Sequence, residues 1–157
     1  MSRSVILPGS YDPVTVGHLE IIREATELYD EVFVVAFINP EKNYLFTPEE
    51  RLRMLRIATE GLGVKVDFSE GLVIDYMRER GITEILKGYR NDADLEYERK
   101  MALWNKQNGG VETRLIKCKP EYSAVSSSAV REALSRGERA EELLPRGVAD
   151  FIAKKYP

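Results

Sequence analysis

The sequence predicts an α/β fold, a Rossmann-like doubly wound sheet of five parallel strands with flanking helices and a helical C-terminal part. The first observation is that apolar runs of strand length alternate with helical patterns through residues 5–117, as they do where helices connect parallel strands. The second is that only helical patterns follow the last of these runs. With 157 residues and no internal repeat or linker, the chain is expected to form a single domain over residues 1–157.

The first strand and the first helix are joined by the most unusual segment of the chain. The apolar residues 5–7 lead into PGSYDP at residues 8–13 and then into TVGH at residues 15–18, which holds the only histidine. An apolar helical stripe follows, carried by Leu19, Ile22, Ala25 and Leu28. A strand that ends in such a turn and continues as a helix collects free backbone N–H groups and a positive helix end at one point, so this turn is suited to bind an anion.

The next elements follow from the same periodicities. Strands are expected at residues 32–38 and 64–68 because both are short apolar or alternating runs. Between them, Thr47 is expected to cap a helix, with Pro48 in its first turn and Glu50 completing a capping box. The apolar stripe expected on this helix is formed by Leu52, Leu55, Ile57 and Ala58.

Two glycine stops define the middle of the chain. A helix is expected at about residues 73–80, ending at Gly81, and a longer one at about residues 92–108, ending at Gly109 and Gly110. The remaining strands are expected at residues 84–87 and 113–117. In the last third, VSSS at residues 125–128 is expected to cap a helix that contains Val130 and Leu134, and Pro145 to open a final helix with Val148, Phe151 and Ile152.

Composition narrows the function classes. Lys and Arg number 23 and Asp and Glu 26, so the formal net charge is −3, which offers no basic field for a nucleic acid. Cys118 is the only cysteine, which excludes an internal disulfide; we expect it to be a buried filler near the end of the last strand. No apolar run approaches the roughly 18 residues of a membrane span, and no signal peptide is recognisable, so we expect a cytoplasmic protein without a membrane partner.

Polar and cationic residues follow the ends of the predicted strands. They are Ser10 and His18, Lys42, KGYR at residues 87–90, and YSAVSSS at residues 122–128. Ligands of an open parallel sheet bind beyond the carboxyl ends of its strands, and cations that converge there with helix starts can neutralise a polyphosphate. The G-x-x-x-x-G-K-[ST] and G-x-G-x-x-G loops are absent, which counts against P-loop kinases and common dinucleotide dehydrogenases. The sequence therefore indicates phosphate chemistry of another kind.

Five motifs in order resemble those of bacterial phosphopantetheine adenylyltransferases, a family of the nucleotidyltransferase superfamily marked by [TH]-x-G-H. They are PGSYDP at 8–13, TVGH at 15–18, KGYR at 87–90, EYE at 96–98 and VSSSAVR at 125–131, and the resemblance spans the whole chain. Thr15, at the first position of the histidine motif, is similar to the phosphopantetheine branch of the superfamily.

The resemblance implies an activity and its partners. AMP moves from ATP to 4′-phosphopantetheine, giving dephospho-coenzyme A and pyrophosphate in coenzyme A biosynthesis, with Mg²⁺ as cofactor. The resemblance also implies a homohexamer and feedback binding of coenzyme A. Because the acceptor phosphate is already an anion at neutral pH, such a transfer needs little help from a general base and much from positive groups that align two repelling anions.

Site residues are implied by their positions in the matched motifs. His18 is implied as the transition-state stabiliser, with Lys42 and Arg90 as further catalytic residues, and no side chain is implied as a metal ligand. ATP binding is implied for Ser10, Tyr11, His18, Gly88, Tyr89, Arg90, Glu98, Tyr122, Ser123, Ala124, Val125, Ser126, Ser127 and Ser128. Acceptor binding is implied for Ser10, Lys42, Val73, Lys87, Met101 and Asn105.

Some positions differ from the residues that are usual in the family. Ser10 stands for threonine, Tyr11 for phenylalanine, Lys87 for arginine, Tyr122 for tryptophan and Asn91 for a small residue. Lys87 bears most on function, because arginine grips a phosphate with a planar fork and lysine offers a point charge. Two alternatives therefore stay open: a related nucleotidyltransferase with a different phosphorylated acceptor, and a nucleotide-binding regulator without catalysis.

Several candidate residues also have an ordinary structural interpretation. Lys42 is a solvated loop charge on that view, and Glu98 belongs to an ion-paired helix face. The serine run is then a helix N-cap, and Val73 and Met101 are core residues.

Overall fold

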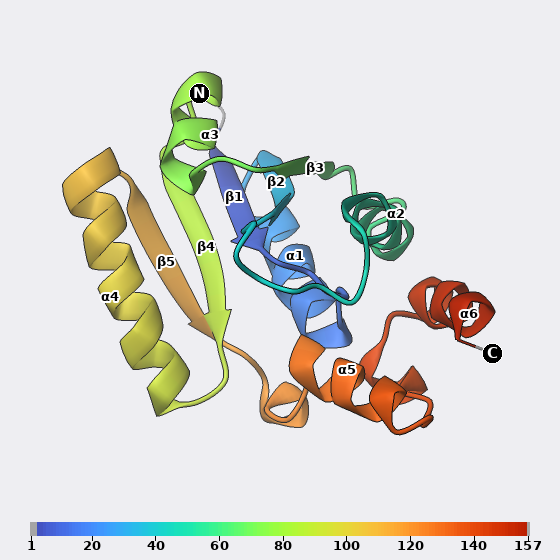
Figure 1. Cartoon of the computed structure of the whole chain (residues 1–157). Coiled ribbons are helices and arrows are strands. Elements are labelled where there is room, and N and C mark those ends of the chain that lie inside the picture. The colour runs from blue at the N-terminus through green and yellow to red at the C-terminus, as the bar shows by residue number, and fades with distance from the viewer. Residues whose placement is uncertain (1–2, 157) are drawn as a thin grey trace.

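The computed structural model describes residues 3–156 and places one parallel sheet at the centre of the molecule (Figure 1). Its strands lie in the order β3-β2-β1-β4-β5, and the Rossmann-like α/β class is confirmed. The strands are β1 (Ser4–Gly9), β2 (Glu31–Phe37), β3 (Lys65–Ser69), β4 (Glu84–Tyr89) and β5 (Glu112–Lys117).

Two strands run two residues further toward their carboxyl ends than the sequence predicts, and β3 runs one residue further. In β1, Pro8 and Gly9 still pair with β2, and in β4, Gly88 and Tyr89 still pair with β5. Neither extension is apolar, so neither carries the pattern of a buried strand. Both bring motif residues to the carboxyl edge of the sheet.

The strand order reverses between β1 and β4. From β1 the chain builds outward to β2 and β3 on one side, then returns to place β4 and β5 on the other. Ile6 of β1 lies opposite Ile85 of β4 in their register. A crevice forms at such a reversal, beyond the carboxyl ends of the two central strands.

Alternate residues of the central strands face two helical layers. Val5 and Leu7 belong to a core that includes buried residues of α1 (Val16–Leu28), α2 (Pro48–Ala58), α5 (Ser127–Ser135) and α6 (Arg146–Lys155). On the opposite face, Ile6 packs with Ile85 and with buried residues of α3 (Val73–Arg80). All six expected helices are present, and two 3-10 turns, Pro120–Tyr122 and Glu141–Leu143, were not predicted.

Most predicted helix ends are confirmed. Thr47 caps α2 through the expected capping box with Glu50, and Gly81 ends α3 with a φ of 69°, in the left-handed region that favours glycine. Pro145 is the N-cap of α6, one position before its first residue. Gly110 is the left-handed cap of α4 (Asp92–Gly109), so that helix ends one residue later than predicted.

The predicted apolar stripe on α2 is partly wrong. Leu55 is buried as expected, but its buried neighbours are Arg51 and Met54. These three lie at the i, i+3 and i+4 spacing of one helical face, whereas Leu52 and Ile57 are only half-buried. The pattern misled because a cation occupies a core position, and periodicity analysis counts arginine as polar.

Helix α4 lies along β5 at the edge of the sheet (Figure 1) and has no buried residue. Several of its large apolar side chains are exposed, namely Tyr97, Met101, Leu103 and Trp104. Within residues 3–156, none of the helices has both the length and the apolar character needed to cross a membrane.

Candidate active site

The turn between β1 and α1 is held from several sides. The backbone of Tyr11 has a φ of 48°, and its buried hydroxyl donates to the Leu7 carbonyl at 2.8 Å. The buried carboxylate of Asp12 accepts the N–H groups of Leu45 and Phe46 at 2.8 and 2.9 Å. Because these contacts tie the turn to its own strand and to the segment before α2, the motif residues that follow are rigidly placed.

His18 is part of the cap of α1, so its ring orientation is fixed by backbone contacts. The Thr15 N–H donates to His18 Nδ1 at 3.0 Å, and the His18 N–H donates to Thr15 Oγ1 at 3.3 Å. Since Nδ1 accepts a hydrogen bond, the proton of the neutral ring is on Nε2. The Tyr11 ring packs edge-on against the imidazole, with ring centroids 4.9 Å apart.

The same surroundings keep this imidazole uncharged. Burial first, and then the positive charges of Lys87 and Arg90, lower the pKa of His18 to about 4. At neutral pH, His18 is therefore a neutral hydrogen-bond donor through Nε2 and carries no charge of its own.

A cavity of about 350 Å³ opens beside this ring, and we call it the histidine cavity. It brings together most of the residues expected to bind ATP, from the first turn, the end of β4, the helix α4, the 3-10 turn Pro120–Tyr122 and the start of α5. They are Ser10, Tyr11, His18, Gly88, Tyr89, Arg90, Glu98, Tyr122, Val125, Ser126 and Ser127.

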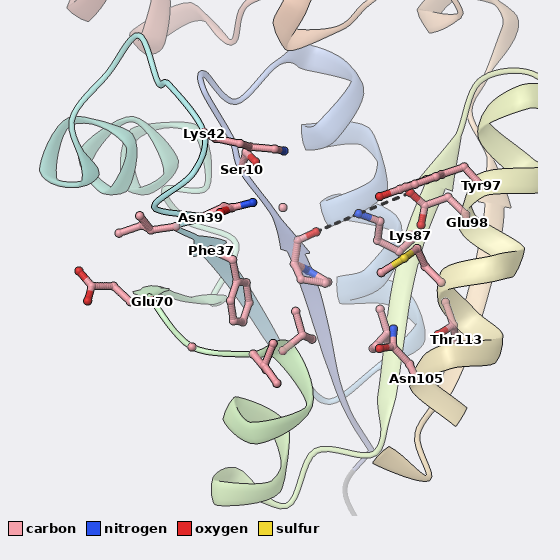
Figure 2. A pocket seen from close by; sticks show the side chains of 18 of the residues that line it. Ser10, Phe37, Asn39, Lys42, Glu70, Lys87, Tyr97, Glu98, Asn105 and Thr113 are labelled. Carbon is pink, nitrogen blue, oxygen red and sulfur yellow. Dashed lines mark hydrogen bonds and ion pairs between the residues drawn. The ribbon is translucent and has the colours of Figure 1, made fainter. Parts of the chain in front are cut away.

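A second cavity, of about 670 Å³, lies between the carboxyl ends of β1, β2 and β4 and the helices α3 and α4; we call it the larger cavity (Figure 2). It contains every residue expected to bind the acceptor, which are Ser10, Lys42, Val73, Lys87, Met101 and Asn105. Figure 2 shows Lys42 and Ser10 together on one side, facing Lys87 and Glu98 on the other.

The two cavities share a wall formed by residues 8–10, Lys87 and Glu98. Lys87 Nζ donates to the Pro8 carbonyl at 3.3 Å and lies 3.8 Å from Glu98 Oε1. Burial raises the pKa of Glu98, and the nearby Lys87 opposes that rise. Glu98 therefore forms an ion pair, as its structural interpretation expects. Its partner is Lys87 on the shared wall and not a cation on the face of its own helix.

Arg90 has a carboxylate partner as well. Its Nε donates to Asp94 Oδ2 at 3.0 Å, and its backbone N–H donates to the same oxygen at 3.1 Å. Asp94 lines the histidine cavity and was not foreseen. The Arg90 side chain is therefore held at the rim by an ion pair four residues along the chain.

The serine run makes more internal contacts than the sequence suggests. Ser126 Oγ accepts the Ala129 N–H at 3.0 Å as the N-cap of α5, and Ser127 Oγ donates to the Pro13 carbonyl at 2.7 Å. Ser123, Ala124 and Ser128 are exposed and line neither cavity. What this segment offers a ligand is mainly the positive N-terminal end of α5.

Besides Asp94, the histidine cavity is lined by Arg131 and Cys118, to which the sequence analysis assigned no role in the site. Arg131 lines it and donates to the Asp12 carbonyl at 2.8 Å; its spacing of four from Ser127 places both on one helical face and was an available signal. Cys118 also lines the cavity and is half-buried, so its prediction as a buried filler is wrong. It lies one residue beyond the end of β5, and its N–H donates to the Tyr89 carbonyl at 2.9 Å.

The donors near the site do not form a metal centre. In the part of the chain that the structure describes, no group of three or more His, Cys, Asp and Glu side chains is arranged to hold an ion. The carboxylates of Asp12, Asp94 and Glu98 each have a protein partner.

Comparisons with known proteins place the chain in a family. A cytidylyltransferase-like family model matches residues 6–133. A phosphopantetheine adenylyltransferase from Symbiobacterium thermophilum is 44% identical over 153 residues, which cover 96% of this chain and 94% of that protein. The crystal structure of a lipopolysaccharide core biosynthesis protein from Thermoplasma volcanium has a TM-score of 0.56 at 19% identity, covering 76% of this chain and 98% of the other, and shows a shared fold. The turn that presents His18 and the two adjoining cavities thus belong to a chain that is a member of the phosphopantetheine adenylyltransferase family.

Proposed function

We propose that the protein transfers AMP from ATP to the phosphate of 4′-phosphopantetheine, giving dephospho-coenzyme A and pyrophosphate. The observation that carries this proposal is the shared wall of residues 8–10, Lys87 and Glu98, next to His18. Two cavities that meet at such a wall can hold two phosphorylated molecules with their phosphates together. Family membership supplies the identity of the two substrates.

The reaction is a displacement at the α-phosphorus of ATP. An oxygen of the acceptor phosphate forms a bond to that phosphorus, and the bond from the phosphorus to the bridging oxygen of pyrophosphate breaks, so pyrophosphate leaves with the electron pair. The His18 Nε2–H donates to an oxygen on which negative charge grows, and a fixed neutral donor of this kind stabilises the transition state more than the ground state. Lys42 and Arg90 add positive charge on the two sides.

The two cavities suggest how the substrates divide the site. The nucleotide occupies the histidine cavity, with its β- and γ-phosphates toward the start of α5 and Arg90. The acceptor phosphate lies against Ser10, Lys42 and Lys87, and the pantetheine arm lies in the larger cavity. Val73 and Met101 give that arm an apolar surface and Asn105 gives it one amide, which suits a chain of methylenes and peptide bonds.

Adenylyl transfer from ATP generally requires a divalent metal ion, and we propose Mg²⁺. The carboxylates around the site are engaged with protein partners and do not fit a resident magnesium centre. Mg²⁺ therefore enters as part of the nucleotide, bound to the triphosphate oxygens, as is common for this ion.

The direct test is pyrophosphate release from purified protein with ATP, Mg²⁺ and 4′-phosphopantetheine, with dephospho-coenzyme A identified by mass. The matched control omits the acceptor. Since lysine replaces the arginine usual at position 87, a panel of other phosphorylated acceptors is run in parallel. Turnover only with another acceptor would favour a related transferase, and tight ATP binding without turnover for any acceptor would favour a regulator.

We also propose a homohexamer and the binding of coenzyme A. Helix α4 supports the assembly, because none of its residues is buried in the single chain. Its large apolar side chains Tyr97, Leu103 and Trp104 are exposed and could pack against another copy of the chain. Light scattering should then give about 107 kDa, six times the 17.9 kDa of one chain.

Coenzyme A contains the pantetheine arm of the acceptor, so it should compete with 4′-phosphopantetheine for the larger cavity. Inhibition that more acceptor does not relieve would contradict this.

A further inference from the structure

The most unusual buried group in the molecule is the guanidinium of Arg51, in the first turn of α2. The residue is 1% exposed, and it is among the largest side chains that are fully buried. Its Nε and Nη2 atoms have no hydrogen-bond partner in the protein, and it forms no ion pair with an acidic side chain of residues 3–156. The buried carboxylate of Asp12, in the turn between β1 and α1, instead accepts the N–H groups of Leu45 and Phe46 and pairs with the Arg131 guanidinium.

A charge in this position is costly to the folded protein. Arginine stays protonated in proteins, so the guanidinium cannot become neutral to lower the cost of its burial. Replacing a buried, poorly paired charge with an apolar side chain of similar volume often leaves a protein equally or more stable. Stability alone therefore does not account for Arg51.

Its contacts lead directly to the walls of the active site. Arg51 Nη1 donates to the Ser10 carbonyl at 3.0 Å, and Ser10 lines both cavities. The guanidinium carbon also lies 4.0 Å from the centroid of the Tyr44 ring. The Tyr44 hydroxyl accepts the Asn39 N–H at 2.8 Å, so Tyr44 closes the loop of residues 39–44 that carries Lys42.

We propose that Arg51 is a positioning residue whose buried, unpaired charge holds Ser10 and Tyr44 in place and is balanced by the phosphates that bind on the other side of the Ser10 peptide. The free protein keeps an uncompensated cation, and the bound anions compensate it. A charge with few polar neighbours acts over a longer distance than a solvated one, because water does not screen it. This inference rests on the proposed phosphate site and adds a residue that does not itself line either cavity.

The test compares Arg51→Met with Arg53→Met. Methionine keeps most of the apolar stem and removes the charge, while Arg53 lies two residues further along α2, is exposed and lines neither cavity. We expect Arg51→Met to bind Mg·ATP and pyrophosphate about tenfold more weakly, while the free protein melts at the same or a higher temperature than the wild type. Arg53→Met should bind both anions as the wild type does.

The two readouts separate this role from a structural one. If Arg51 only supported the fold, Arg51→Met would have a lower melting temperature and an unchanged affinity for the two anions. That pair of results would overturn the proposal. Arg51→Lys, which keeps the charge, should bind Mg·ATP nearly as tightly as the wild type; a loss of affinity of about tenfold or more would also overturn the proposal. This comparison needs only the wild type, so it stands even if the methionine variant does not fold. If the wild type itself binds neither anion, the proposed function fails first, so the two failures are distinguishable.

Discussion

His18, in the cap of α1, should make the free energy of unfolding depend on pH. His18 has an ordinary pKa of 6.5 in the unfolded chain and one of about 4 in the folded protein. The unfolded chain therefore binds a proton more readily, and the folded state loses stability as the pH falls. The contribution is fully present above about pH 6.5 and is lost progressively as the pH falls through about 4.

The size of the effect follows from these two values. At pH 5.0 the imidazole is almost fully protonated in the unfolded chain and about one-tenth protonated in the folded protein. Proton linkage then makes the folded state about 2 kcal/mol less stable at pH 5.0 than at pH 7.5, from this residue alone. Other groups also titrate in this interval, so a matched variant is needed to isolate the histidine.

His18→Gln is that variant, because glutamine at the third helical position can keep the capping hydrogen bond to the Thr15 N–H without titrating. The assay is urea unfolding of the ligand-free protein at pH 7.5 and 5.0. We expect the wild type to lose about 2 kcal/mol more than His18→Gln between the two pH values. Equal losses would refute the assignment of a half-buried, neutral His18 that accepts through Nδ1.

Four further predictions concern the site, the core and the assembly. His18→Ala should lower kcat by about 10² or more in a pyrophosphate-release assay, with a smaller change in the Kd for ATP; unchanged kcat would remove the ring from its role. Lys87→Met should raise the KM for 4′-phosphopantetheine by about tenfold or more and leave the Kd for ATP nearly unchanged; an effect on ATP alone would reverse our division of the cavities. Ile22→Ala empties a fully buried position and should lower the free energy of unfolding by about 2–5 kcal/mol in urea; a loss below 1 kcal/mol would contradict the packing. Trp104→Glu should reduce the mass measured by light scattering, and an unchanged hexamer would show that this face of α4 lies outside the interfaces.

The strands and helix caps were predictable because their signals are local. The capping box of Thr47 and Glu50 and the glycine stop at Gly81 are each written within a few residues. The parallel direction of the strands also follows from the alternation of helices and strands, since parallel strands need such crossovers, whereas their order came from the structure. The motifs that line the site were found through resemblance, and the sheet edge explains why distant motifs meet.

The features that were missed depend on contacts between distant segments. Nothing near Arg51 indicates that its guanidinium is buried, because its partner Ser10 is 41 residues away. The Ser127 hydroxyl is bound by a carbonyl 114 residues away, so its availability to a ligand could not be judged from the run of serines. The wall common to both cavities is likewise a product of packing between β1, β4 and α4.

The proposed adenylyl transfer depends on a neutral His18 that faces the meeting point of two phosphates, and the chain has no other histidine. Nitrogen NMR of protein labelled in the histidine ring therefore reads this one residue directly. We expect the proton on Nε2, a pKa near 4 in the free protein, and a clear change of the Nε2 signal when ATP and Mg²⁺ bind. A pKa near 6.5 together with an Nε2 signal that ATP leaves unchanged would contradict the account.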